Sequence, residues 1–139
     1  MPFLEVTIPR IDEATRRQLA EKLNVEFIEA TGFEDEVLHI CFKEYDPAEI
    51  AVAGKLWDGS QGRPFTQFLL HCPRVRHDVK RAIVSGLTTV FTQCMNDPDW
   101  NPMIYILEFP YENIGVNGQL LTDTDEELAD RPFYYILPR

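Results

Sequence analysis

The chain opens with an alternating stretch, residues 2–9, which predicts a β-strand with one buried face. Leu4, Val6 and Ile8 fall on one side of this strand, and Phe3, Glu5 and Thr7 fall on the other. Three later stretches are also predicted to be strands, over residues 37–42, 65–72 and 103–109.

Helices are predicted between these strands because apolar residues recur every four positions. Asp12 is a suitable N-cap for a helix that reaches about Ala30, and Gly32 would end that helix. The buried face of this first helix is expected to carry Leu19, Leu23 and Phe27. The second helix is marked by Val79, Ile83, Leu87 and Phe91.

The chain matches itself, without gaps, at a shift of 64 residues. Pro9 and Arg10 fall on Pro73 and Arg74, and the stretch 50–56 falls on 114–120. Such a repeat indicates two copies of one unit that bury their apolar faces against each other. We therefore expect a single domain over 1–139, made of repeats at about 2–56 and 66–120 with a tail at 121–139.

Each copy reads strand, helix, strand, and such a unit places its two strands parallel through a right-handed crossover. Two copies predict an α+β fold, in which a four-stranded mixed sheet carries both helices on one face. The opposite face is expected to hold Glu5, Thr7, His39, His71 and Tyr105. That face would lie open unless other subunits cover it, so we expect a homo-oligomer. In the tail, residues 133–137 are predicted to add a short edge strand to the same or a neighbouring sheet.

Composition narrows the choice of partners. A net charge of −10 and a pI near 4.6 exclude a dense basic face, so no nucleic-acid ligand is expected, and local Arg residues must hold any anionic substrate. No apolar run is long enough to span a membrane and no signal-peptide pattern is present, which favours a cytoplasmic protein with no membrane partner. The three Cys and three His form no metal-ligand spacing, so we expect a metal site only if such residues converge in space.

Pro2 is the most suggestive residue for chemistry, because it follows Met1 directly. If Met1 is removed, the chain begins with a secondary amine at a strand end. A chain-terminal amine has a pKa of about 7.7–8.0, and desolvation or nearby cations would lower it toward the range of a general base. The alternative is that Pro2 is simply the first residue of a strand, where its missing N–H removes no hydrogen bond between strands.

An amino-terminal proline, a repeated strand–helix–strand unit and a Gly-containing closing hairpin together resemble the tautomerase superfamily, over about residues 2–120. Relatives with two repeats include the macrophage migration inhibitory factor group, malonate semialdehyde decarboxylase and cis-3-chloroacrylic acid dehalogenase, while 4-oxalocrotonate tautomerase has one repeat. The resemblance implies a trimer whose sheets face inward. It also implies that the amine of Pro2 lies at the mouth of a pocket between subunits.

The resemblance also implies roles for residues at matching positions. Arg residues just after the first strand of a repeat bind the substrate carboxylate in the family, and those places hold Arg10, Arg74 and Arg76. Tyr105 falls where several relatives place a Tyr that donates to the substrate, and His39 falls where an Arg polarises the substrate carbonyl. Asn117 lies in the closing hairpin, where a turn with positive φ is its expected role.

The chain departs from the family at other positions. The carboxylate and the His of the cis-dehalogenase relatives fall at about Val116 and Phe27, which argues against that hydrolysis. The Asp of the decarboxylases falls at Val37, although Asp35 and Glu36 lie close by.

The resulting hypothesis is a tautomerase that needs no cofactor, in which Pro2 moves a proton in an enolisable 2-keto acid or related unsaturated carboxylate. Two alternatives stay open. In one, protonated Pro2 acts as the acid in decarboxylation, hydration or dehalogenation of a short unsaturated acid. In the other, the chain is a trimeric binding protein that keeps the fold without the chemistry.

Overall fold

The computed structural model describes residues 2–126, and the order of elements occurs twice within them. The first copy contains β1 (Phe3–Pro9), α1 (Glu13–Thr31), β2 (His39–Tyr45), η1 (Pro47–Glu49), β3 (Ala51–Val52) and β4 (Lys55–Leu56). The second contains β5 (Gln67–Pro73), α2 (His77–Cys94), β6 (Met103–Phe109), η2 (Tyr111–Asn113), β7 (Gly115–Val116) and β8 (Gln119–Leu120). A short helix, α3 (Leu121–Thr124), follows.

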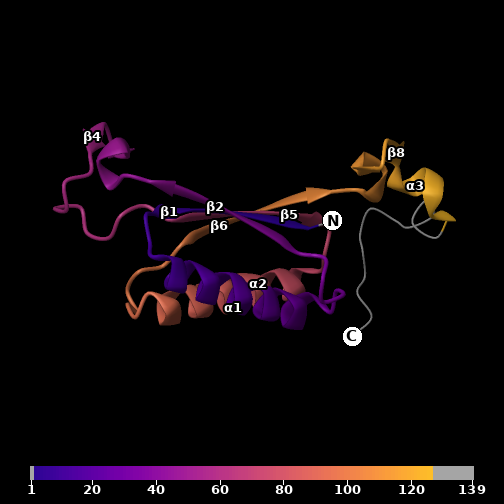
Figure 1. Ribbon diagram of the computed structural model, residues 1–139, viewed down its shortest axis with the longest axis horizontal. Coiled ribbons are helices and arrows are strands. Elements are labelled where there is room, and N and C mark those ends of the chain that lie inside the picture. The colour runs from indigo at the N-terminus through magenta and orange to yellow at the C-terminus, as the bar shows by residue number, and fades with distance from the viewer. Residues whose placement is uncertain (1, 127–139) are drawn as a thin grey trace.

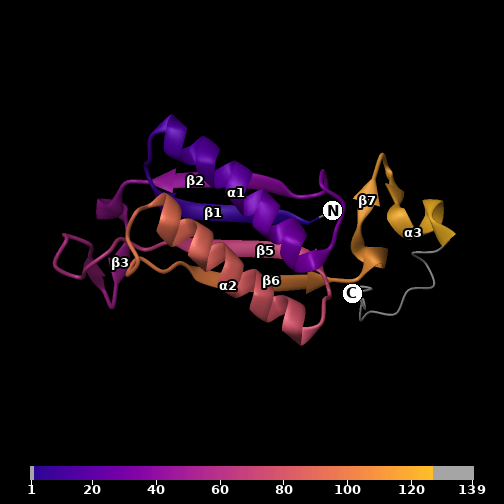
Figure 2. The same ribbon diagram turned by 90° about the horizontal axis from the view of Figure 1, so that it is seen from below.

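Four strands form one mixed sheet in the order β2-β1-β5-β6, and both long helices cover the same face (Figures 1 and 2). β1 and β2 are parallel, as are β5 and β6, while β1 and β5 join the two copies in antiparallel register. Phe3 pairs with His71 and Thr7 with Gln67 in that joint. The predicted α+β fold is confirmed.

The first long helix begins and ends where its sequence predicts. The Asp12 side chain accepts a hydrogen bond of 2.7 Å from the Thr15 N–H, which satisfies one of the free donors at the start of α1. Gly32 ends the helix in the left-handed region at φ 72°, and its N–H donates to the Ile28 carbonyl.

The core lies between the helices and the sheet. Its fully buried side chains come from alternate positions of β1 and β5 and from the predicted faces of both helices, namely Leu4, Val6, Ile8, Phe68, Leu70, Cys72, Leu19, Leu23, Phe27, Val79, Ile83, Leu87 and Phe91. Phe91 packs edge-on against Phe68 and Trp100, with ring centroids 5.6 and 5.4 Å apart. The apolar pattern therefore fixes which face of each element points inward.

Each copy closes with a small hairpin, β3–β4 or β7–β8, whose turn has two residues in the left-handed region. Ala53 and Gly54 have φ 51° and 79°, and Asn117 and Gly118 have φ 53° and 80°. The expected turn role of Asn117 is confirmed. The hairpins project from opposite ends of the sheet, on the side away from the helices (Figure 1).

Two strands are shifted from their predicted positions. The second was expected over 37–42 and occupies His39–Tyr45, because Val37 is held in a turn by a hydrogen bond of 3.3 Å from its N–H to the Glu34 carbonyl. The third was expected over 65–72 and occupies Gln67–Pro73. The strand predicted over 133–137 lies outside the described residues. Within residues 2–126, no helix combines the length and apolar character needed to cross a membrane.

Candidate functional site

Pro2 lies at the end of the sheet where β1 begins and β5 ends. Because Phe3 pairs with His71, Pro2 continues β1 to a position opposite Cys72, and Arg74 follows directly after β5. Pro2 is buried, and its carbonyl accepts a hydrogen bond of 3.2 Å from the His39 N–H. The antiparallel joint thus brings Pro2, Arg74 and Arg76 to one end of the sheet.

Arg74 lies among charged groups of its own repeat. Its Nε is 3.0 Å from a carboxylate oxygen of Glu108, and Lys80 on α2 forms an ion pair with the same carboxylate. The first copy has the matching pair of Arg16 and Glu44. The sequence repeat could have predicted this pairing, because Arg16 is equivalent to Lys80 and Glu44 is equivalent to Glu108.

Arg76 caps the start of α2, and its guanidinium faces a neighbouring acid. Nε and Nη2 lie 3.1 Å from the two carboxylate oxygens of Asp78, and the arginine lowers the pKa of that carboxyl group. Both arginines near Pro2 therefore already contact a carboxylate, which orients each guanidinium and offsets part of its charge.

The other predicted site residues divide between the ends and the open face of the sheet. His39 begins β2 beside Pro2, and Asn117 lies in the β7–β8 hairpin that follows β6 at the same end. Tyr105 lies at the middle of β6, opposite Leu69. Arg10 follows Pro9 at the opposite end, about 23 Å away for a seven-residue strand. Within one chain, Arg10 and Tyr105 are therefore separated from Pro2.

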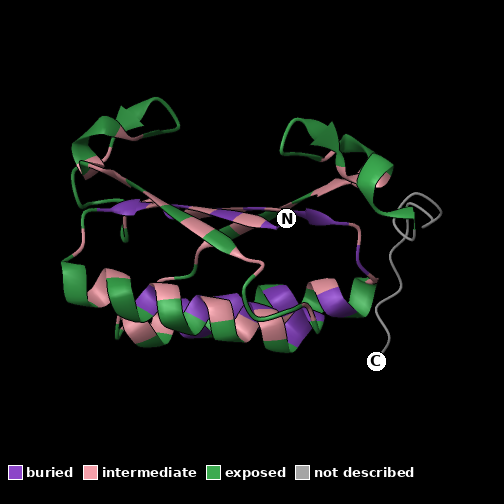
Figure 3. Cartoon of the chain, turned by 45° about the vertical axis from the view of Figure 1, so that its right-hand side comes forward, coloured by how far each residue is buried: buried purple, intermediate pink, exposed green. Residues whose placement is uncertain are grey.

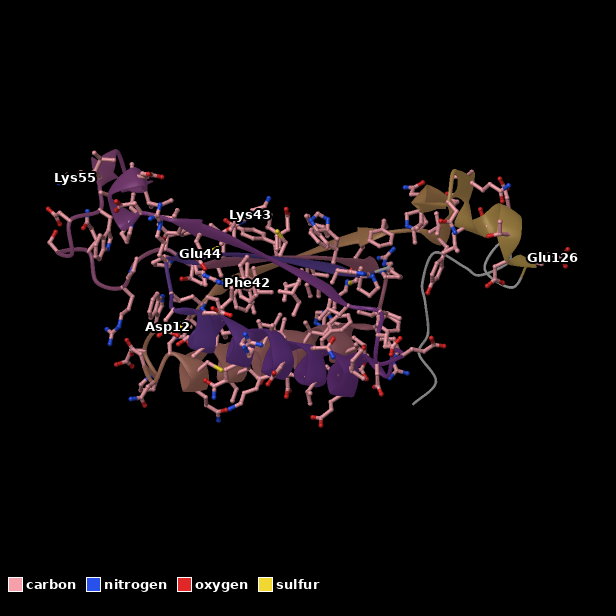
Figure 4. All side chains as sticks on the ribbon, in the orientation of Figure 1. Asp12, Phe42, Lys43, Glu44, Lys55 and Glu126 are labelled. Carbon is pink, nitrogen blue, oxygen red and sulfur yellow. The ribbon has the colours of Figure 1, made fainter. Side chains whose placement is uncertain are left out.

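Sequence reasoning missed a charged cluster on the face of the sheet that the helices leave open. Glu5 lies 2.5 Å from Lys43 Nζ and 3.2 Å from His71 Nε2, so the cluster links three neighbouring strands. The Lys43 hydrogen bond, with a smaller contribution from His71, lowers the pKa of the Glu5 carboxyl. Figure 4 shows Lys43 on the side away from the helices, while Phe42 and Glu44 lie toward them.

The two halves of this open face differ in polarity. The edge strand β2 presents His39, Cys41 and Lys43 there, and the equivalent positions of β6 present Met103, Tyr105 and Leu107. The last three are 53%, 47% and 43% exposed. Figure 3 shows exposed residues on both hairpins, which flank this face. The predicted location of Glu5, Thr7, His39, His71 and Tyr105 on the open face is confirmed.

The structure also shows where the residues lie at which the sequence departs from the family pattern. Phe27 is fully buried in the core, whereas Val116 is exposed in β7. Asp35 and Glu36 are exposed in the loop before β2, at the Pro2 end of the sheet. Across residues 2–126, no three His, Cys, Asp or Glu side chains group closely enough to hold a metal ion.

Comparison with known proteins finds no matching family model and no matching curated protein sequence. Solved structures do match. Pt0534 inactivated by 2-oxo-3-pentynoate has a TM-score of 0.74 at 15% identity, covering 88% of this chain and 97% of its own. An asymmetric trimer of wild-type fused 4-OT gives 0.73 at 18% identity, covering 88% and 98%. Malonate semialdehyde decarboxylase, described with decarboxylase and hydratase activities, gives 0.71 at 14% identity, covering 88% and 96%. The chain thus has the fold of these tautomerase-superfamily enzymes, as its sequence predicted.

Proposed function

We propose that this chain, which has the fold of fused 4-OT, is a cofactor-independent tautomerase in which Pro2 transfers a proton within an enolisable 2-oxo acid. The observation that carries the proposal is the joint between β1 and β5, which sets a buried Pro2 and two arginines at one end of the sheet. In the chain from which Met1 is removed, Pro2 carries the free amine.

The surroundings of Pro2 favour a neutral amine. Burial disfavours the charged form and so lowers the pKa of an amine. The neutral nitrogen takes the enol O–H proton and returns it to the neighbouring carbon as the carbonyl forms. Arg74 and Arg76 hold the substrate carboxylate and stabilise the negative charge that develops on the dienolate.

A trimer completes the proposed site. The open face carries exposed Met103, Tyr105 and Leu107, and a fused 4-OT of the same fold forms trimers. In this arrangement, Tyr105 and Arg10 act on the Pro2 of a neighbouring subunit, whereas His39 and Asn117 line the site of their own chain.

The proposal is tested with phenylenolpyruvate, whose conversion to the keto form is followed by ultraviolet absorbance. Pro2→Ala replaces the secondary amine by a primary one of different geometry, and we expect kcat/KM to fall at least about a hundredfold, the usual contribution of a general base. Pro47→Ala, in η1 at the opposite end of the sheet, should keep its activity. Undiminished activity in Pro2→Ala would contradict the base assignment.

A covalent probe checks the amine independently of turnover. We expect 2-oxo-3-pentynoate, the inactivator bound in the Pt0534 structure, to add one reagent mass at Pro2. The reaction is run with Cys41→Ser, because Cys41 is exposed and could react instead. Intact mass also reports whether Met1 is absent, and a chain that retains Met1 should give neither adduct nor activity.

Decarboxylation or hydration of a short unsaturated acid is the second candidate. It is favoured by the likeness to malonate semialdehyde decarboxylase and by Asp35 and Glu36 at the Pro2 end. A pKa above about 8.5 for the Pro2 amine would leave it mostly charged at neutral pH and support this acid role. If neither reaction occurs and carboxylates give no thermal protection, the chain is a binding protein.

A further inference from the structure

A cavity of about 260 Å³ lies at the opposite end of the sheet from Pro2, where β5 and β6 begin. Its walls include Arg63, Phe65, Thr66, Trp100 and Pro102. The volume is just below the range of about 300–1,000 Å³ that holds drug-sized ligands, so it suits a smaller molecule. A strand of seven residues separates this end from Pro2, so the two places are independent within one chain.

The internal repeat relates this cavity to the position of Pro2. Subtracting 64 from the lining residues 66 and 99–103 gives 2 and 35–39, which are the residue just before β1 and the stretch that leads into β2. Thr66 is therefore the second-copy equivalent of Pro2. Lying inside the chain, it supplies a hydroxyl group instead of an amine.

The hydroxyl of Thr66 is a buried polar group of the cavity lining that lacks a hydrogen-bond partner in the described part of the chain. The residue is only 4% exposed, and its Oγ1 is buried with no hydrogen-bond partner among residues 2–126. The backbone carbonyl of Thr66 does have a partner, because it accepts a hydrogen bond of 2.9 Å from the Met103 N–H. A buried hydroxyl without a partner costs about 1–3 kcal/mol, which a ligand oxygen could recover.

The charges around the cavity disfavour an anion. Arg63 donates from Nε and Nη2 to the two carboxylate oxygens of Asp97, at 2.8 and 3.0 Å, and its Nη2 lies 3.8 Å from Asp99. Two carboxylates thus face one guanidinium. The Arg63 contact lowers the pKa of Asp97, which keeps that carboxyl group ionised at neutral pH.

Apart from Asn101, the rest of the wall is apolar, and Trp100 in it is held in place. Trp100 donates from its indole N–H to the Pro64 carbonyl at 3.1 Å and packs edge-on against Phe91. Pro64, Phe65, Pro102 and Met103 complete this part of the lining. An apolar wall with a few polar groups, among them one buried hydroxyl, matches the usual composition of a small-molecule site.

We infer that the second repeat carries a binding site for a small uncharged carbonyl compound with an aromatic or branched body. When the Thr66 side chain turns about χ1 toward the cavity, its hydroxyl donates a hydrogen bond to the carbonyl oxygen of the ligand, and the apolar body packs against Trp100 and Pro102. The site binds without proton transfer, because no amine is present there. It is independent of the chemistry at Pro2.

The probes are acetophenone and benzoate, which share a ring but differ in charge. Binding is followed by NMR through the indole N–H of Trp100, with the indole of Trp57 as an internal reference because Trp57 donates to Gly62 outside the cavity. We expect acetophenone to shift the Trp100 signal saturably and benzoate to bind at least about tenfold more weakly. Pro2→Ala should leave the Trp100 response intact even if it abolishes turnover.

Thr66→Val removes the hydroxyl at nearly constant volume and should weaken acetophenone binding about tenfold, which corresponds to about 1.4 kcal/mol. Thr66→Ser keeps the hydroxyl and should retain most of the affinity, so it tests the site even if the valine variant folds poorly. Thr89→Val, on the exposed face of α2, is the matched control. The inference is overturned if acetophenone leaves Trp100 unshifted, if both indoles shift alike, if benzoate binds more tightly, or if Thr66→Val binds as well as the parent.

Discussion

Cys72 occupies an unusual place for a thiol, because it is fully buried in the core and lies opposite Pro2 across the joint of the two repeats. Burial raises the pKa of Cys72 to about 12, and the nearby Glu108 carboxylate adds to this effect. The thiol therefore stays protonated and unreactive at neutral pH. Cys41, by contrast, is exposed on the open face.

This burial predicts a loss of stability in alkali. An unfolded Cys loses its proton near pH 9, whereas folded Cys72 keeps its proton to about pH 12, so the unfolded state binds fewer protons in this window. The free energy of unfolding should then fall by about 1.4 kcal/mol per pH unit between these values. Urea unfolding at pH 8, 9 and 10 measures the slope.

Cys72→Ala should remove this part of the slope, and Cys41→Ala is the matched control. Lys43 and Tyr45 also have raised pKa values, so some alkaline loss should persist in every variant. An unchanged slope in Cys72→Ala would show that the thiol is not the source.

At the residue scale, the sequence proposed Pro2, Arg74 and Arg76 as candidates but did not predict the side chains that contact the two arginines. The ion pair of Arg74 with Glu108 joins a loop to the next strand, and the Glu5 cluster joins three strands. Such contacts depend on register between strands, which alternation alone does not specify. The repeat pointed to Glu108 only through its equivalence with Glu44.

At the scale of elements, the two helices pack closely at Gly86. A Cβ built on Gly86 would lie 2.6 Å from both Cγ and Cδ of Glu26, far inside normal contact. The absence of a side chain on α2 therefore makes room for Glu26 on α1, at the usual helix-interior cost of glycine, about 1 kcal/mol relative to alanine.

This contact predicts that one substitution has different effects in two backgrounds. Gly86→Ala alone should be nearly neutral, because moving Glu26 out of its rotamer costs about 0.5–1.5 kcal/mol and offsets the gain in helix propensity. In a Glu26→Ala background, the same change should stabilise the fold by about 1 kcal/mol through helix propensity. A double-mutant cycle by urea unfolding measures the coupling, and additive effects would refute the clash.

Elements were the part that the sequence predicted best. Residues four apart identified both helices, and the predicted strand Met103–Phe109 has the observed bounds. The start of β2 was misplaced because Val37 and Leu38 are apolar yet precede the first paired residue, His39. Hydrophobicity marks burial, whereas strand ends depend on hydrogen bonding that composition does not reveal.

For the whole molecule, the open face is the feature that decides assembly. In the proposed trimer, Leu107→Glu would bury an unpaired charge between subunits, so we expect the dissociation constant of the trimer to rise at least about a hundredfold. Val25→Glu places the same charge at a 55% exposed site on α1 and should leave assembly unchanged. Sedimentation across a concentration series measures the dissociation constant of the trimer for both variants. A Leu107→Glu trimer as stable as the parent would contradict the proposed interface.

The segment between the repeats, residues 57–65, has a consequence of its own. Within residues 2–126, the two halves of the sheet join through β1 and β5, a contact of the kind that separate chains would form reversibly. A short covalent tether gives such partners an effective concentration in the millimolar range, whatever the concentration of protein. Dilution can therefore separate one chain from another but not one repeat from its partner.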